Sequence, residues 1–205
     1  MIVAHPDDET LWAGGLILSH PDYDWFIAAL CRKSDPDRSG RFRRALDAYR
    51  ARGAMADLDD GPAQEPLPLD EIQREILRIL PEYSYELILT HAPGGEYTRH
   101  RRHEEVSRAV TGLWEAQKIS SSGLCMFAYD DDQGRRLPQA IRSAHRVEAL
   151  PPPLSKEKYW MITEVYGFQP ETWEARTTPR TEAFWCFDSP SALQAWLPGP
   201  AGGED

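Results

Sequence analysis

Short apolar runs alternate with segments of helical character along most of the chain. Mainly apolar runs of strand length occur at residues 1–4, 24–31, 85–90, 123–129 and 182–187. A run of this length without polar alternation is typical of a strand buried on both faces. Segments that favour helices lie between the runs, at 14–20, 41–54, 70–83, 103–116, 155–162 and 189–197. This order predicts an α/β protein with a mostly parallel sheet and helices on both faces.

Residue types at the segment ends predict where the helices and the domain stop. Gly53 is expected to end the helix over 41–54, and Asp70 to cap the helix over 70–83. Ser155 marks the expected start of a later helix. Residues 198–205 are too rich in Gly and Pro to pack. At 205 residues the chain is long enough for one core. We therefore expect a single domain over 1–197 and a flexible C-terminal tail over 198–205.

Charge and hydropathy exclude several classes of partner. The formal net charge is −10 and the pI is near 5.1, which argues against nucleic acid as a partner because its binders usually present a basic face. No apolar run approaches the ~20 residues that a membrane span needs. Nothing at the start resembles a secretory signal, so a cytoplasmic location is expected. Cys31, Cys125 and Cys186 are odd in number and far apart, so buried thiols are expected rather than a disulfide framework.

The first motif with chemical potential is HPDDE, at residues 5–9, directly after the first predicted strand. His5 and Asp8 are three residues apart, a spacing that lets an imidazole nitrogen and a carboxylate oxygen converge on one cation. Adjacent carboxylates repel each other when they are buried, and a divalent metal would stabilise them. The alternative is a solvated turn in which Asp7 and Asp8 cap the following helix. The motif alone does not decide between the two.

A second histidine cluster follows the strand at 85–90 and changes this balance. His91, His100 and His103 lie within the segment THAPGGEYTRHRRHEEV, so four of the six histidines fall in two loops that each follow a strand. Ligands of α/β proteins bind beyond the carboxyl ends of strands. At the start of a helix, His100 and His103 share a face, and one can bind a metal while the other faces the space beside it. A metal site built from both loops is therefore the better interpretation.

Such a site would have the parts needed for hydrolysis. Three protein ligands leave the fourth position of a zinc site to water, which becomes a nucleophile near neutral pH. Asp7 is next to a ligand but not used by the metal, so it is suited to take the proton of that water. His100 could stabilise the oxyanion that develops. These parts fit the hydrolysis of a carbonyl compound.

AHPDDE after a strand, the glycine pair at 14–15 and the later THAPGGEYTRHRRHEEV together resemble the PIG-L/LmbE-like family of metal-dependent deacetylases. The likeness extends over about the first two thirds of the chain. It implies a Rossmann-like three-layer α/β/α sandwich and an amidohydrolase that removes the N-acetyl group from a small amino-sugar conjugate of the N-acetylglucosamine type. It also implies that His5, Asp8 and His103 bind Zn²⁺, with Fe²⁺ or another divalent metal as the alternative. Asp7 is then the general base and His100 assists the transition state.

Two features of the later cluster depart from the family pattern. Arg101 and Arg102 stand where relatives commonly have Pro and Asp, and they either raise the local potential for an anionic substrate or lie solvated on the helix surface. The surface interpretation is preferred for each. Tyr97 is one residue further from His100 than the assisting tyrosine of some relatives, so it stays a weak candidate. Glu9 is expected to support the turn.

Two other functions remain open at this point. The chain could be a metal-binding or regulatory domain of the same fold that has lost turnover, or a metal-dependent hydrolase of phosphate esters. The expected partner is a small amino-sugar substrate rather than nucleic acid, with assembly into a homo-oligomer left open. The brevity of the strand before AHPDDE puts stability in question more than metal binding.

Overall fold

The structure is a computed structural model that describes residues 1–81, 84–98 and 100–197. The elements of the first half are β1 (Ile2–Val3), α1 (Asp8–Ser19), β2 (Phe26–Cys31), α2 (Pro36–Tyr49), β3 (Arg52–Leu58), α3 (Leu69–Ile79), β4 (Ser84–Thr90) and α4 (Arg101–Glu115). Those of the second half are β5 (Ser120–Phe127), β6 (Tyr129–Asp130), β7 (Gln139–Ala140), β8 (Arg146–Ala149), α5 (Pro152–Trp160), the π-helical turn η1 (Met161–Val165), α6 (Trp173–Thr177), β9 (Thr181–Phe187) and α7 (Pro190–Trp196).

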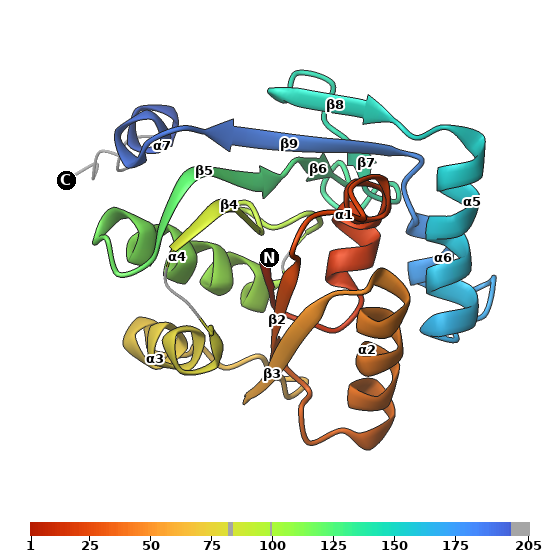
Figure 1. The fold of residues 1–205 in the computed structure, drawn as a ribbon, viewed down its shortest axis with the longest axis horizontal. Coiled ribbons are helices and arrows are strands. Elements are labelled where there is room, and N and C mark those ends of the chain that lie inside the picture. Colours follow the sequence, from red (N-terminus) through yellow and green to blue (C-terminus); the bar gives the residue numbers. More distant parts are fainter. Residues whose placement is uncertain (82–83, 99, 198–205) are drawn as a thin grey trace.

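Parallel strands form the centre of the molecule. β1, β2 and β3 pair in parallel, and β4 pairs in parallel with β5. β9 then runs antiparallel to both β5 and β8. β1 contacts β4 on the side away from β2, and the Ala4 N–H donates to His91 Nε2 at 2.9 Å. The strands form two sheets, in the orders β1-β2-β3 and β4-β5-β9-β8, and β1 lies beside β4 where the sheets meet (Figure 1). From this point the chain adds β2 and β3 in one direction and β5 in the other, so the strand order reverses between β1 and β4.

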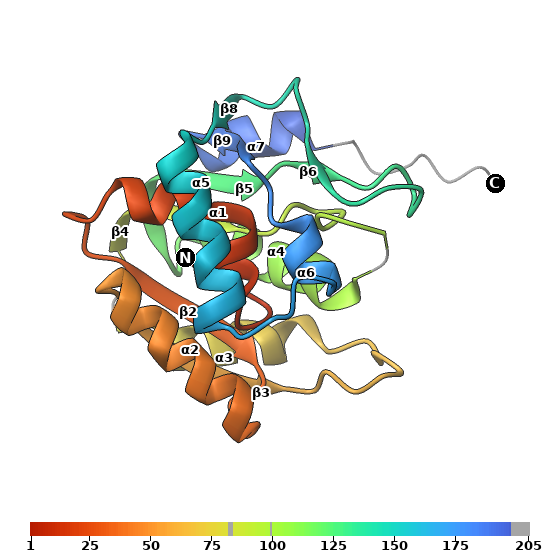
Figure 2. The ribbon, with the colours of Figure 1, turned by 90° about the vertical axis from the view of Figure 1, so that its right-hand side faces the viewer.

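Helices cover both faces of these strands, as the alternation of segments predicted. α3 and α4 lie on one side, and α1, α2 and α5 lie on the other (Figures 1 and 2). Alternate residues of β2 explain why, because Ile27 and Ala29 pack into the core beneath α1 and α2, while Ala28 and Leu30 pack into the core beneath α3 and α4. Burying one large aliphatic side chain stabilises the fold by ~1.5–3 kcal/mol. The predicted α/β/α fold with mostly parallel central strands is confirmed.

A buried ion pair supports α1, the helix that begins at the HPDDE motif. The helix is interrupted at Ala13, whose φ of −145° and ψ of 17° are not helical. The freed N–H groups of Gly15 and Leu16 donate to the Glu182 carboxylate on β9, at 2.7 and 2.8 Å. Lys158 of α5 donates to the same carboxylate at 2.7 Å. β9 and α5 therefore hold the interrupted part of α1 in place through one carboxylate.

The structure corrects the boundary predicted at Gly53. α2 ends at Tyr49, and Arg50 takes the left-handed conformation with φ 55°. Gly53 lies inside β3, a strand that the sequence pattern did not predict. A Cβ on Gly53 would stand 2.6 Å from the Ile27 carbonyl oxygen, so glycine lets β3 approach β2 closely. The helix also begins earlier than expected, at Pro36, because the Asp35 side chain caps it.

Two other helix starts differ from the sequence predictions. α3 begins at Leu69 after Pro68, so Asp70 lies in the first turn and pairs with Arg74 at 2.6 Å instead of capping the helix. α5 begins at Pro152, upstream of Ser155, because proline suits the first turn of a helix. None of the helices in the described part of the chain is long and apolar enough to cross a membrane. The predicted tail, residues 198–205, lies outside the described residues, and the single domain stays a prediction.

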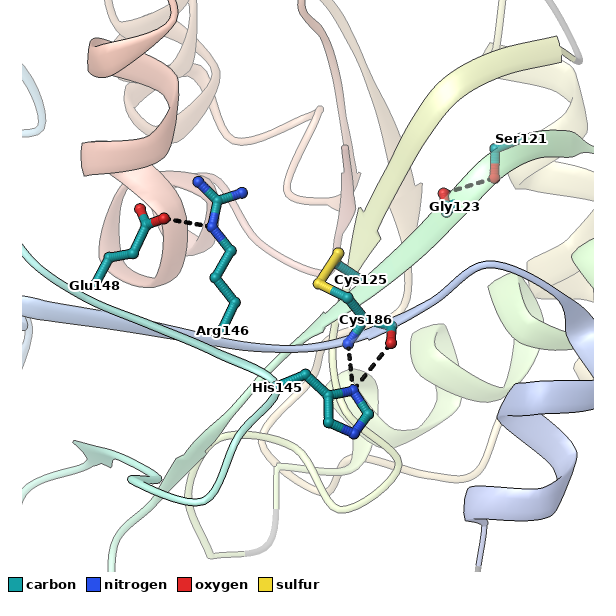
Figure 3. Close-up of a disulfide and its surroundings, with 7 residues drawn as sticks. All are labelled: Ser121, Gly123, Cys125, His145, Arg146, Glu148 and Cys186. Atoms are coloured by element: carbon teal, nitrogen blue, oxygen red, sulfur yellow. Dashed lines mark hydrogen bonds and ion pairs between the residues drawn. A yellow bond between two sulfur atoms is a disulfide. The ribbon is translucent and has the colours of Figure 1, made fainter.

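The cysteine prediction was wrong for two of the three residues. Cys125 and Cys186 form a disulfide, and Cys31 is a buried free thiol (Figure 3). Although the pair is 61 residues apart in sequence, antiparallel pairing of β5 with β9 puts the two cysteines directly opposite each other. The Cys186 N–H also donates to the His145 ring at 3.1 Å. Disulfides persist mainly in oxidising compartments, so this one does not support the predicted cytoplasmic location. The structure does not show the compartment, and that location stays a prediction.

Candidate functional site

The two loops identified from the sequence meet at one end of the parallel strands. One follows β1 and carries HPDDE, and the other follows β4 and carries the histidine cluster. Because β1 and β4 flank the point where the strand order reverses, their carboxyl ends open a crevice between the loops. A cleft of about 1090 Å³ lies there, and its wall includes His5, Asp7, Asp8 and His100. This volume lies just above the ~300–1,000 Å³ that is usual for small-molecule sites.

The three residues predicted as metal ligands converge in this crevice. His5 Nδ1 lies 3.2 Å from Asp8 Oδ2 and 3.3 Å from His103 Nε2, and His103 Nε2 lies 3.4 Å from Asp8 Oδ2. Tetrahedral zinc with bonds of ~2.0–2.1 Å would place its ligand atoms roughly 3.3–3.4 Å apart. Although burial favours the neutral acid, His103 and His5 hold the pKa of Asp8 well below its usual range. The residues present therefore fit a divalent cation that accepts nitrogen and oxygen ligands.

His91 and His100 also lie close to the three predicted metal ligands, but both ring nitrogens of His91 are already used in hydrogen bonds. Among the described residues, His5, His100 and His103 form one cluster that could hold a metal, and Asp8, His91 and His103 form another. His91 Nε2 accepts the Ala4 N–H, and its Nδ1 lies 2.9 Å from Glu96 Oε2. Both nitrogens of His91 are thus engaged in hydrogen bonds, which leaves it as a support for the loop.

Glu96 orients His103, and the sequence motifs did not identify it. Glu96 Oε2 lies 2.6 Å from His103 Nδ1 and 2.9 Å from His91 Nδ1, and all three side chains are fully buried. Burial favours the neutral acid, but His91 and His103 lower the pKa of Glu96 to about 2, so the carboxylate is ionised. A carboxylate on Nδ1 fixes the ring so that Nε2 points at His5 and Asp8. The sequence feature that could have identified Glu96 is its position as an acid between two histidines in a Gly-rich loop.

Asp60 lies beside the second nitrogen of His5 and was also missed. It follows β3, and its Oδ1 lies 3.3 Å from His5 Nε2, while Arg32 donates to Oδ2. Each of the two predicted histidine ligands therefore has a carboxylate near its second nitrogen, but His103 Nδ1 is hydrogen-bonded to Glu96, whereas His5 Nε2 has no hydrogen-bond partner within the described residues. The signal for Asp60 was weak because β3 was not predicted, so the end of that strand could not be placed at the site.

Asp7 has an unusual backbone and a well-defined side chain. Its φ of 111° lies in the left-handed region, which is rare for residues other than glycine. The residue is at the N-cap of α1, but its side chain makes no capping hydrogen bond. Instead, Arg38 of α2 donates to Asp7 Oδ2 at 2.9 Å. Burial raises the pKa of Asp7 to about 8, against the lowering effect of Arg38. The solvated capping turn considered from the sequence is therefore not what forms.

His100 is at the N-cap of α4, where its ring stacks on His103 with centroids 4.2 Å apart. Burial, followed by the nearby His103 and His5, lowers the pKa of His100 to about 3. Its Nδ1 has no hydrogen-bond partner within the described ranges. A neutral imidazole at this position can donate one N–H hydrogen bond into the cleft.

Comparison with known proteins identifies the family. Residues 1–114, more than half of the chain, match the family described as PIG-L, GlcNAc-PI de-N-acetylase. The chain belongs to the PIG-L family. The matched region contains all five predicted site residues, the last of which is His103.

Other relatives of this PIG-L family member are distant in sequence. The uncharacterized protein L374 of Acanthamoeba polyphaga mimivirus is 22% identical over an alignment of 148 residues, and the match covers 64% of this chain and 62% of that protein. The chain thus spans less than two thirds of the length of this curated relative. A zinc-inhibited form of the teicoplanin deacetylase Orf2 has a TM-score of 0.64 at 14% identity, and the match covers 92% of this chain and 97% of that one.

Another solved structure has the same fold and a different named activity. GalB, the 4-carboxy-2-hydroxymuconate hydratase of Pseudomonas putida, has a TM-score of 0.61 at 16% identity, and the match covers 90% of this PIG-L chain and 94% of that one. At these identities the structural likenesses establish the fold alone.

The arginine pair of this PIG-L chain differs from the surface interpretation at one position. Arg101 is exposed and lines the cleft. Arg102 is fully buried, where it pairs with Glu105 and donates to the Glu65 carbonyl at 2.8 Å. A guanidinium carries five donors, so it can tie the helix start to the preceding loop. The prediction that Arg102 lies on the surface was wrong.

Aromatic side chains form part of the cleft wall. Tyr97 and Trp173 both line the cleft, with ring centroids 4.7 Å apart, and Trp173 is 37% exposed. Trp12 packs against both rings from the interior. Trp173 belongs to α6, outside the region that matches the PIG-L family. The sequence pattern alone did not indicate which tryptophan faces the cleft.

Proposed function

We propose that the chain is a metal-dependent N-deacetylase that removes the N-acetyl group from a small conjugate of the N-acetylglucosamine type. The observation that supports this most strongly is the spacing of 3.2–3.4 Å among His5 Nδ1, Asp8 Oδ2 and His103 Nε2. Membership of the PIG-L family supports the reaction class. The likeness to the zinc-inhibited teicoplanin deacetylase is consistent with a divalent metal.

His5, Asp8 and His103 would hold the metal, with Zn²⁺ as the first choice and Fe²⁺ as the alternative. When bound there, a divalent cation supplies Lewis acidity toward the acetamide carbonyl and lowers the pKa of water. Glu96 Oε2 bonds to the outer nitrogen of His103 at 2.6 Å, and Asp60 Oδ1 lies 3.3 Å from the outer nitrogen of His5. The His103 ring, which is fixed by this hydrogen bond, loses little freedom when a cation binds.

The remaining polar residues would move protons and stabilise charge. Asp7 accepts a proton from the attacking water and later delivers it to the departing amine, so that acetate and a free amine result. Arg38 holds the Asp7 carboxylate in place through its contact at 2.9 Å. His100 donates a hydrogen bond to the oxyanion that forms on the acetamide. Tyr97, which lines the same cleft, is a further candidate donor.

The cleft wall is consistent with an amino-sugar conjugate. The wall contains the Trp173 and Tyr97 rings together with charged side chains that include Arg32, Arg101 and Asp60. An apolar sugar face packs on aromatic rings, while hydroxyl groups bond to charged and polar side chains. The catalytic groups belong to the first half of the chain, and the ring of Trp173 comes from the second half.

A product assay separates this proposal from its rivals. Metal-loaded protein is incubated with a panel of N-acetylated amino-sugar conjugates, and acetate is measured before and after treatment with a chelator. We expect acetate release that the chelator abolishes and added Zn²⁺ or Fe²⁺ restores. Protein that holds metal but releases no acetate from any member of the panel would contradict the proposal and favour an inactive metal-binding domain.

Two further readouts test the other reactions. Phosphate release from phosphorylated sugars without acetate release would favour a phosphate-ester hydrolase. The likeness to the GalB hydratase favours a test for addition of water to a conjugated carbon–carbon double bond, followed by ultraviolet absorbance. Loss of that absorbance without acetate release would assign the site to hydration.

A further inference from the structure

The backbone of Asp7 requires a restraint beyond the first turn of α1. Its φ of 111° and ψ of −26° are sparsely populated for an aspartate, and such a conformation persists only where neighbouring groups hold it. Its carbonyl oxygen accepts the N–H groups of Thr10 and Leu11 at 2.9 and 2.8 Å. Its own N–H donates to Glu9 Oε2 at 3.0 Å. The orientation of the Asp7 side chain thus depends on where the Glu9 carboxylate lies.

Glu9 is held by hydrogen-bond donors on both of its oxygens. Oε1 accepts the Thr10 hydroxyl and the Tyr166 hydroxyl, each at 2.6 Å, while Oε2 accepts the Asp7 N–H. Thr10 Oγ1 is in turn 2.8 Å from the Tyr49 hydroxyl. An amide could not replace this carboxylate without turning its NH₂ group toward a donor. Both oxygens of Glu9 thus act as acceptors, and only a carboxylate offers two acceptor oxygens at this position.

Tyr166 reaches this network from the second half of the chain. It follows the π-helical turn η1, and its N–H donates to the Met161 carbonyl oxygen at 2.9 Å. Arg41 of α2 donates to the Tyr166 carbonyl oxygen, and Arg44 donates to the Val165 carbonyl oxygen at 3.2 Å. These contacts fix the end of the π-helical turn, where hydrogen bonding within the helix stops. π-helical turns occur frequently at functional sites.

We propose that Glu9 and Tyr166 are positioning residues for the general base. The Tyr166 hydroxyl orients the Glu9 carboxylate, and Glu9 holds the Asp7 N–H in the backbone conformation that points the Asp7 carboxylate into the cleft. Both side chains are fully buried, so neither touches a substrate. Tyr166 lies outside residues 1–114, so a segment beyond the family match contributes to catalysis. The inference rests on the proposed function for its catalytic consequence, but not for the contact itself.

The test compares Tyr166→Phe with Tyr129→Phe on the full, zinc-loaded chain. Tyr129 is a matched control because its buried hydroxyl donates to the Trp12 carbonyl oxygen of α1 at 2.9 Å and does not contact Glu9. The first readout is the hydrogen-exchange protection of the Asp7 amide, measured by NMR, which needs no substrate. The second is the pair kcat and KM for acetate release, with metal content and melting temperature measured on the same samples.

For Tyr166→Phe we expect Asp7 amide protection to fall about tenfold and kcat to fall about tenfold or more, with KM and metal content unchanged. For Tyr129→Phe we expect wild-type values of all four. Unchanged protection in Tyr166→Phe, or lost protection with unchanged kcat, would overturn the proposal. So would a loss of activity that only follows lost metal or a lost folded fraction. If the wild type releases no acetate, the proposed function fails, and the Asp7 protection data still decide whether Tyr166 positions that residue.

Discussion

Glu96 is the residue whose loss we expect to weaken metal binding without removing a ligand. Its Oε2 lies 2.6 Å from His103 Nδ1 and 2.9 Å from His91 Nδ1. Loss of a carboxylate behind a metal-bound imidazole commonly lowers metal affinity by ~10–100-fold. At ~1.4 kcal/mol for each factor of ten, this is ~1.4–2.8 kcal/mol of binding free energy. For Glu96→Ala, which leaves both imidazoles without their acceptor, we expect the upper end of that range.

Glu96→Gln is the graded version of the same change. The glutamine oxygen can still accept from both imidazoles, but its NH₂ group then faces the Ala92 N–H, which donates to Glu96 Oε1 at 3.3 Å in the wild type. We therefore expect Glu96→Gln to lower metal affinity by about tenfold, at the lower end of the range. The assay is the zinc dissociation constant, measured by competition with a chromophoric chelator, with thermal unfolding of the same samples.

Glu182→Gln is the control, because it alters an equally buried carboxylate that is bonded to Lys158 and to main-chain N–H groups of α1. We expect it to lower the free energy of unfolding and leave the zinc dissociation constant unchanged. A folded Glu96→Ala protein with wild-type zinc affinity would refute the idea that Glu96 orients His103 for the metal. An equal loss of zinc affinity in Glu182→Gln would mean that general loosening explains the effect.

Three other outcomes can be checked independently. Trp173→Ala should raise KM for an amino-sugar substrate by about two- to tenfold with unchanged zinc content, because a ring contact contributes ~0.5–1.5 kcal/mol; an unchanged KM would remove Trp173 from substrate binding. Gly53→Ala should lower the free energy of unfolding in urea by ~1–3 kcal/mol, because a Cβ there would stand 2.6 Å from the main chain of β2, whereas Gly94→Ala meets nothing within 4 Å and should cost less. Equal costs would argue against the close approach of β3. Reduction of the Cys125–Cys186 disulfide, which spans 61 residues, should destabilise the fold by about 4 kcal/mol, and an unchanged melting temperature would contradict this.

Periodicity predicted the elements that have strong patterns of their own. β2, β4 and β5 each contain a mainly apolar run, and α4 has a regular apolar face, so each was expected close to where it forms. β3 was missed because it contains Arg52, Gly53 and Asp57 and carries no apolar run of its own. Its strand conformation comes from pairing with β2, a tertiary contact that single-sequence patterns do not contain.

Some residues of the site could be predicted from local sequence motifs, whereas others reach the site only through contacts between distant segments. The five predicted residues sit in motifs with short spacing, so they could be proposed from the sequence. Four of them line the cleft, and the fifth, His103, is buried against His5 and Asp8. Asp60 and Trp173 carry no motif, and only the fold brings them to the site. Arg102 could not be placed because burial of an arginine depends on acceptors from another segment, the Asp59 and Glu65 carbonyl oxygens. Cys125 and Cys186 meet for the same reason, through the pairing of β5 with β9.

The adjacent carboxylates of HPDDE offer the most direct test of the proposed chemistry, because Asp7 is assigned to proton transfer and Asp8 to the metal. The measurement is zinc content together with acetate release for Asp7→Asn and Asp8→Asn, each compared with the wild type. We expect Asp7→Asn to keep its zinc and lose turnover by about 10²–10⁴-fold, the usual contribution of a general base. Asp8→Asn should lose zinc and turnover together. Wild-type turnover in zinc-loaded Asp7→Asn, or loss of zinc from Asp7→Asn with zinc retained in Asp8→Asn, would contradict this division of roles.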